Sequence, residues 1–287
     1  MKRVVPLSVL VAGVMLYGCD VNRALEQVSE ARHSAADLTV QFTKAADAGN
    51  LAVMADTDEA SQRFAAEARA RADAAEKDVA TVRARLTSLN FSEELRLLDA
   101  FAGHFTTFRK LDATILELAV ANTNLKAQQL SFGAAQDSID ELAERLARLA
   151  PAKDSDGTWH VRALAASVLA RAREVQALQA RHIAEPEEPA MRTVELRMST
   201  AEKGARDELA ALAPLVHQDA RAELAAASGA FERLMAVNKQ VLELSHRNTN
   251  VRSLAMALTE KRTVVTACED SLRAFEQALA KRSYRGR

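Results

Sequence analysis

The sequence predicts an all-α protein, and three observations support this prediction. Aromatic residues make up only 4% of the 287 residues, and the chain has only 9 glycines and 5 prolines, whereas hydrophobic residues reach 48%. Alanine, a strong helix former, supplies much of this apolar fraction. No proline occurs from residue 7 to residue 150. Because a sheet-rich fold needs frequent glycine and proline turns, we expect closely packed helices.

Breaks in the hydrophobic pattern divide the chain into helices. Gly49-Asn50 and residues 88–92 interrupt the first half, residues 151–158 form a predicted linker, residues 185–189 form a proline-containing loop, and Pro214 marks a helix end in the second half. Three helices are expected in each half. They span residues 21–48, 51–88, 92–149, 159–184, 190–213 and 216–282.

The second half of the chain repeats the first at an offset of 126 residues. Residues 115–126 align without a gap on residues 241–252, and six of the twelve positions are identical. The sequence therefore predicts an elongated antiparallel helical bundle built from two homologous three-helix units with long third helices. The predicted repeats are residues 19–150 and 159–287, joined by the linker at 151–158.

The long third helices carry a hydrophobic seam with the 3-4 spacing of a coiled coil. Its members are Phe108, Leu111, Ile115, Leu118, Asn122 and Leu125, with the counterparts Leu234, Val237, Val241, Leu244, Asn248 and Val251. This spacing puts Asn122 and Asn248 at core positions. Cys268 aligns with Leu142, so we expect a buried hydrophobe and not a reactive thiol. Gly133 is a candidate kink in the first long helix.

The N-terminus has the layout of a secretory signal. Lys2 and Arg3 precede an apolar stretch at residues 4–17, which is shorter than the roughly 20 residues of a membrane span. An uncleaved hydrophobic anchor is the alternative interpretation. Either interpretation predicts an extracytoplasmic protein.

Residues 16–19, Leu-Tyr-Gly-Cys, resemble the lipobox of bacterial lipoproteins. The resemblance implies that residues 1–18 are a lipoprotein signal peptide and that Cys19 carries the lipid that anchors the protein to the membrane. Asp20 resembles the retention signal of some inner-membrane lipoproteins. We therefore expect a lipid-anchored protein on the periplasmic side, at the inner membrane in preference to the outer membrane.

Charge and motifs disfavour several function classes. The net charge is −1, from 38 basic and 39 acidic residues, so nucleic acid is not an expected partner. The sequence has no glycine-rich phosphate loop, nucleophile elbow or zinc-ligand spacing, and we expect neither an enzyme nor a cofactor. Residues 30–33 and 243–246 both read Glu-x-x-His, the spacing of di-iron bundles, which also need two further inward glutamates. We expect solvated or capping histidines there and no metal site.

Residues 116–127 and their copy at 242–253 resemble the four-helix-bundle sensor modules of methyl-accepting chemotaxis proteins. At the level of pattern, the resemblance extends over most of residues 20–287. It implies a periplasmic bundle that converts the binding of a small molecule into helix displacement. Because we find no second candidate span and no cytoplasmic signalling helices in this sequence, we expect a transmembrane signalling or envelope protein to receive the signal.

The repeated stretch also predicts a ligand site. We expect amide and cationic side chains of the two copies to face one another across a pseudo-two-fold axis and to bind a small anion such as a carboxylate. These side chains are Asn122, Asn124, Lys126, Asn248, Asn250 and Arg252. The alternative is structural, because a buried asparagine in a helical seam commonly fixes register and oligomeric state.

These observations together predict a lipid-anchored, sensor-like helical module that binds a small ligand, a membrane signalling partner, or both. A structural or adaptor bundle of the cell envelope that binds no ligand is the alternative. A metal-binding four-helix-bundle protein is a third and less favoured interpretation.

Overall fold

The computed structural model describes residues 12–149 and 158–282, with side chains from residue 26 onward. These residues are helical almost throughout and contain no strand, which confirms the predicted all-α class. Residues 151–157 of the predicted linker and most of the predicted signal peptide lie outside the described residues, and Thr158, the last residue of the predicted linker, is the first residue of helix α6, Thr158–Ala184. Helix α1 includes Cys19, whose side chain is also outside the described part. Among the described residues, no helix is both long and apolar enough to cross a membrane.

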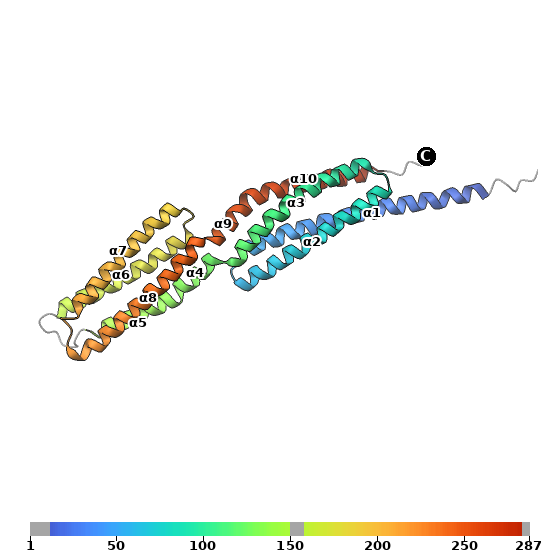
Figure 1. Cartoon of the computed structure of the whole chain (residues 1–287). Helices are drawn as coiled ribbons and strands as arrows, with labels where there is room; N and C mark the ends of the chain where they lie inside the picture. The colour runs from blue at the N-terminus through green and yellow to red at the C-terminus, as the bar shows by residue number, and fades with distance from the viewer. Residues whose placement is uncertain (1–11, 150–157, 283–287) are drawn as a thin grey trace, which may run out of the picture. The chain divides into compact units, whose positions relative to one another are not determined.

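The described chain folds into ten α-helices, one 3₁₀-helix and one π-helix (Figure 1). Their bounds are α1 Ala12–Met54, α2 Asp58–Ser88, α3 Ser92–Ala121, α4 Thr123–Phe132, α5 Ala134–Ala147, α6 Thr158–Ala184, α7 Glu188–Leu212, the 3₁₀-helix Gln218–Ala220, α8 Arg221–Arg247, α9 Thr249–Met256, the π-helix Ala257–Lys261 and α10 Arg262–Lys281.

The first helix break is not where the sequence predicted it. Helix α1 continues through Gly49 and Asn50 to Met54. The chain turns at residues 55–57, where the Thr57 hydroxyl accepts a hydrogen bond from the backbone N–H of Ala60 at 3.1 Å and caps α2. Gly49 therefore has another role, which the packing around it explains below.

The predicted long third helices are each interrupted twice. Asn122 separates α3 from α4, and Asn248 separates α8 from α9, with φ of 54° and 50° in the left-handed region. Asparagine tolerates this conformation better than most residues. Gly133 breaks the helix again between α4 and α5, at the predicted kink. The π-helix at 257–261 makes the corresponding interruption between α9 and α10.

Unit 1, one of two compact units in the chain, contains residues up to Val120 and from Leu254 onward. Helices α1, α2, α3 and α10 line its largest hydrophobic cluster. Phe42 is central to this cluster, with its ring 5.3 Å from Phe108 and 5.8 Å from Phe101, both edge to face. Cys268 is fully buried in the same cluster, as its alignment with Leu142 predicts.

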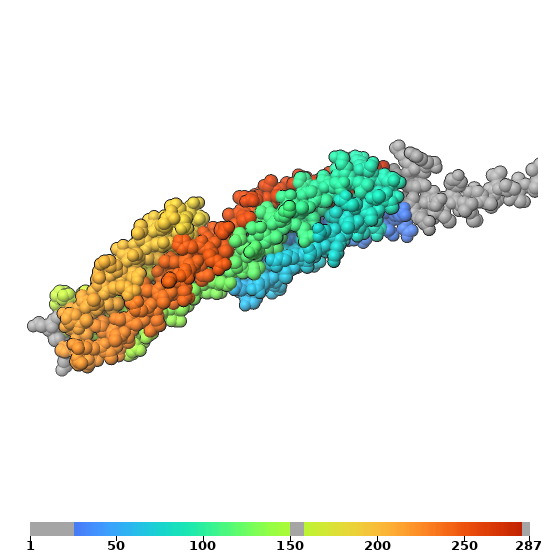
Figure 2. Space-filling view, viewed as in Figure 1, coloured from blue at the N-terminus to red at the C-terminus, as the bar shows by residue number. Residues whose placement is uncertain are grey.

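Unit 2 contains residues Ala121–Ser253, and helices α5, α6, α7 and α8 line its core. In the space-filling view, side chains fill the gaps that the ribbon leaves between the helices of a unit (Figure 2). The unit boundaries at 120/121 and 253/254 differ from the predicted repeat boundaries at 150 and 159. The reason is that α10, the last helix of the chain, packs into the core that contains α1, α2 and α3.

Candidate functional site

The two Asn-Thr-Asn sequences, residues 122–124 and 248–250, meet inside unit 2 and form a polar layer. Both left-handed asparagines are buried, as are Thr123, Asn124 and Thr249. The left-handed turn ends α3 and α8 so that α4 and α9 begin at a threonine with free backbone N–H groups. Each copy supplies the partners for the N–H groups of the other.

The hydrogen bonds of the polar layer are reciprocal. The N–H of Thr123 donates to Thr249 Oγ1 at 3.0 Å, and the N–H of Thr249 donates to Thr123 Oγ1 at 3.2 Å. The N–H of Asn124 donates to Asn250 Oδ1 and the N–H of Asn250 donates to Asn124 Oδ1, both at 3.1 Å. The two Asn-Thr-Asn sequences thus exchange equivalent hydrogen bonds.

The side-chain amides of the layer are also engaged. Asn124 Nδ2 donates to Asn248 Oδ1 at 2.8 Å and to the carbonyl of Ile183 at 2.7 Å, which uses both of its hydrogens. Asn250 Nδ2 donates to Asn122 Oδ1 at 2.6 Å. A ligand bound in this layer would have to displace these hydrogen bonds.

The two cations of the predicted ligand site take other positions. Lys126 Nζ donates to the carbonyl of Ala121 at 3.0 Å, and Arg252 is exposed. The structure therefore brings the four predicted asparagines together as hydrogen-bond partners of one another. Ligand binding by the six residues stays a prediction.

Unit 1 contains a buried ion pair that the sequence analysis missed. Lys261 Nζ lies 2.7 Å from Asp112 Oδ1, and the two side chains are 2% and 5% exposed. The ammonium also donates to the carbonyl of Ala46 at 3.3 Å. Burial raises the pKa of Asp112, and the charge of Lys261 opposes this shift.

The buried pair explains Gly49. A Cβ at this position of α1 would lie 2.5 Å from Lys261 Nζ and 2.8 Å from Asp112 Oδ1, closer than such atoms can approach. Glycine inside a helix normally costs stability. Here it provides the space in which two charges pair.

A pocket of about 280 Å³ adjoins the pair in unit 1. It lies between the end of α1 and the segment that runs from α9 through the π-helix into α10. Its lining residues are Asn50, Val53, Met54, Leu254, Ala257, Leu258, Lys261, Arg262 and Val265. The walls are mostly apolar, and the two cationic residues come from the π-helix and the first residue of α10. Short π-helices are frequent at functional sites.

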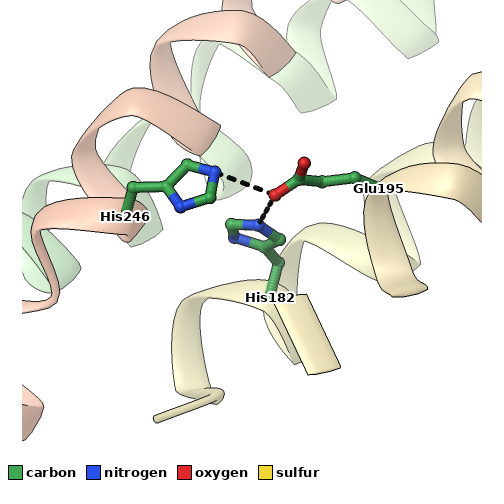
Figure 3. A group of neighbouring side chains, drawn as sticks. All are labelled: His182, Glu195 and His246. Atoms are coloured by element: carbon green, nitrogen blue, oxygen red, sulfur yellow. Dashed lines mark hydrogen bonds and ion pairs between the residues drawn. The ribbon is translucent and has the colours of Figure 1, made fainter. Parts of the chain in front are cut away.

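A third group of polar side chains, two histidines and one glutamate, lies in unit 2. His182 in the last turn of α6, Glu195 in α7 and His246 in the last turn of α8 come together, and Figure 3 shows both imidazole rings directed at the same carboxylate oxygen. Glu195 Oε1 lies 2.8 Å from the Nε2 atom of each histidine. His182 is fully buried, whereas Glu195 and His246 are partly exposed.

The repeat alignment contained a signal for the buried pair but none for the histidine group. Lys261 aligns with the buried Ala135 and lies seven residues, or two helical turns, before the buried Cys268, which indicates a core position. By contrast, His182 and Glu195 belong to no spacing motif. His246 belongs to the Glu-x-x-His sequence 243–246, but Glu243 is not in the group.

The chain was compared with models of known protein families, with curated proteins and with solved structures, and none of these matches it.

Proposed function

We propose that this chain is a lipid-anchored, extracytoplasmic helical module that binds a small apolar anion and acts through a membrane partner. The observation that carries the proposal is the pocket in unit 1. Apolar walls beside cationic side chains suit a ligand with a hydrocarbon body and a carboxylate, and binding pockets generally combine apolar lining with a few polar groups. Arg262 is the exposed cation at this pocket and is suited to a carboxylate.

The pocket also has a means of responding to a ligand. Lys261 lines it and is paired on its other side with Asp112. A ligand that shifts Lys261 would disturb a buried ion pair between the π-helix region and α3. Binding of this kind changes the relative stability of helix positions, which is what a sensor requires.

The proposal includes the duplicated architecture. Helices α1, α2, α3, α4 and α5 align at an offset of 126 residues with α6, α7, α8, α9 and α10. We infer that each unit is an antiparallel four-helix bundle, made from three helices of one copy and the last helix of the other. The reciprocal hydrogen bonds of the polar layer support this pseudo-symmetric arrangement.

A structural or adaptor bundle of the cell envelope is the alternative. The saturated hydrogen bonds among the asparagines favour it, because they suit a register-fixing role better than a ligand site. Under this alternative, the same apolar pocket receives no small molecule.

Binding of octanoate and benzoate to the full chain, measured by calorimetry, tests the proposal. We expect Arg262→Gln and Leu258→Asp to weaken binding about tenfold or more, because the first removes the carboxylate partner and the second adds a repelling charge. Leu196→Asp is the matched control, since Leu196 is also an exposed leucine but lies in unit 2. We expect Arg252→Gln to leave binding unchanged.

Each outcome of this binding experiment distinguishes the proposed pocket from one of its alternatives. Absence of binding to either carboxylate would favour the adaptor alternative. Loss of binding with Arg252→Gln but not with Leu258→Asp would move the site to the polar layer. The anchor is tested separately by labelling cells with radioactive palmitate, which we expect to mark the wild type and not Cys19→Ser.

A further inference from the structure

His182, Glu195 and His246 bring together three atoms that could ligate a metal ion, and the hydrogen bonds of His182 bear on which of its nitrogens carries a proton. Ser245 Oγ lies 2.8 Å from His182 Nδ1 and 2.9 Å from the carbonyl oxygen of His182. A carbonyl oxygen only accepts, so the single hydroxyl proton of Ser245 goes to it. Ser245 Oγ must then accept a hydrogen bond from Nδ1–H of His182.

This assignment fixes the tautomer of His182. In the neutral imidazole, a proton on Nδ1 leaves a lone pair on Nε2. That Nε2 atom faces Glu195 Oε1 at 2.8 Å, which also carries lone pairs. Two such atoms repel at this distance unless a proton or a metal cation lies between them.

His246 faces the same carboxylate oxygen. Its Nε2 atom is also 2.8 Å from Glu195 Oε1. A proton between Nε2 and Oε1 would instead give a hydrogen bond or an ion pair between His182 and Glu195 alone. One cation satisfies all three atoms, because each of them can donate a lone pair to it.

We propose that His182, Glu195 and His246 bind one divalent transition-metal ion of the zinc type. Two imidazole nitrogens and one carboxylate oxygen form a ligand set that zinc uses, whereas Mg²⁺ and Ca²⁺ prefer oxygen ligands only. Bond lengths of about 2.0–2.2 Å separate the ligands of a tetrahedral ion by about 3.3 Å. The three ligand atoms all lie within 4.8 Å of one another, and the two nitrogen–oxygen distances of 2.8 Å must widen by about 0.5 Å to reach tetrahedral separation, which side-chain movement allows.

Partners outside the ligand set orient both rings. Ser245 holds Nδ1 of His182, and Glu188 Oε2 lies 3.4 Å from Nδ1 of His246. A polar partner on the nitrogen remote from the metal is the usual arrangement for a ligating histidine. The partial exposure of Glu195 and His246 gives water access to a fourth coordination position.

The full chain, purified without a polyhistidine tag and stripped with chelator, should bind Zn²⁺ with one ion per chain in a calorimetric titration. We expect Glu195→Gln and His246→Asn to weaken Zn²⁺ binding about 100-fold or more. Ser245→Ala should weaken it about 10- to 100-fold, because it removes the partner that orients His182. Both ligand substitutions are at partly exposed positions, and circular dichroism checks that the metal-free variants remain folded.

Two substitutions serve as matched controls. Glu243→Gln changes the exposed glutamate three residues before His246 in α8, and His217→Asn changes an exposed histidine elsewhere in unit 2. Both should bind Zn²⁺ like the wild type. Zn²⁺ should also raise the thermal unfolding temperature of the wild type and of both controls, but not that of Glu195→Gln.

A second readout is the visible absorption of bound Co²⁺, which reports coordination geometry and should be lost in His246→Asn. Absence of stoichiometric Zn²⁺ binding by the wild type would overturn the proposal. Binding that both Glu195→Gln and His246→Asn retain at full affinity would overturn it as well.

Discussion

Replacing Gly49 by alanine should have the opposite effect from the same replacement elsewhere in unit 1. Glycine to alanine inside a helix normally stabilises a protein by about 1 kcal/mol. Gly103 provides the reference, because it lies inside α3 and a Cβ there would have no atom within 4 Å. Gly103→Ala should therefore stabilise unit 1 by about that amount.

At Gly49 the added Cβ would lie 2.5 Å from Lys261 Nζ, about 1 Å closer than van der Waals contact allows. A lysine side chain normally moves away at little cost. This ammonium is 2% exposed and is held by Asp112 and by the carbonyl of Ala46, so moving it separates a buried ion pair. Breaking such a pair costs about 3–5 kcal/mol. After subtraction of the helix-propensity gain, Gly49→Ala should destabilise the chain by about 2–4 kcal/mol.

Urea unfolding of the full chain at neutral pH, followed by circular dichroism, measures both variants. The decisive comparison repeats Gly49→Ala in a Lys261→Ala/Asp112→Ala background, where the obstructing atoms are gone and the substitution should stabilise. If Gly49→Ala stabilises the wild type as Gly103→Ala does, the steric argument is wrong. An equal destabilisation in both backgrounds would be incompatible with an effect that acts through the ion pair.

Four further predictions rest on the described geometry. Because burial raises the pKa of Asp112, the folded chain retains a proton there at pH values where the unfolded chain has lost it. The stability of the wild type relative to Asp112→Leu/Lys261→Met should therefore fall as pH rises above about 4. Urea unfolding of both proteins from pH 4 to 7 measures this slope. At neutral pH this double variant should be at least as stable as the wild type, and a loss of several kcal/mol would contradict that expectation. Asn122→Ala should be about 1 kcal/mol less stable than Asn122→Gly, since both lose the amide but only alanine is strained at a φ of 54°; equal stabilities would remove the strain argument. Burial, aided by the charge of Glu269, raises the pKa of Cys268 to about 12, so in a Cys19→Ser chain a thiol reagent at pH 8 should label Cys268 only after unfolding, and rapid labelling of the native protein would refute this.

The helical class and the burial of the seam asparagines could be predicted from the sequence, because both depend on local composition and periodicity. The interruptions at Asn122 and Asn248 could not, since an uninterrupted 3-4 pattern passes through both residues. A left-handed turn becomes favourable there only because the other copy supplies hydrogen-bond partners. Periodicity identifies the buried face of a helix but does not reveal a single buried residue whose backbone departs from helical geometry.

At Gly49 the sequence predicted a helix break where the helix in fact continues. As a glycine next to an asparagine it has the composition of a turn, and the sequence analysis placed a helix break there. The actual reason for the glycine is a lysine more than 200 residues away along the chain, which no local rule connects with α1. The histidine group is similar, because His182, Glu195 and His246 meet through the packing of three helices.

The polar environment around Gly49 has a counterpart that lacks charge. At an offset of 126 residues, Gly49 aligns with Val175, Lys261 with Ala135, and Asp112 with Asn238. Val175 and Ala135 are fully buried in the core of unit 2, and Asn238 accepts a hydrogen bond from Gln179 Nε2 at 2.9 Å. In unit 1 a glycine without a side chain is combined with a long charged lysine. In unit 2 the aligned residues are a branched valine and a short alanine.

The aligned positions in unit 2 are thus filled without a charged side chain. This neutral arrangement avoids the desolvation of two ions, so helix packing by itself does not require Lys261 or Asp112 to be charged. Transplanting it, as Gly49→Val/Lys261→Ala/Asp112→Asn, would separate the contribution of shape from that of charge in unit 1. Such an exchange uses the protein's own second copy as the template.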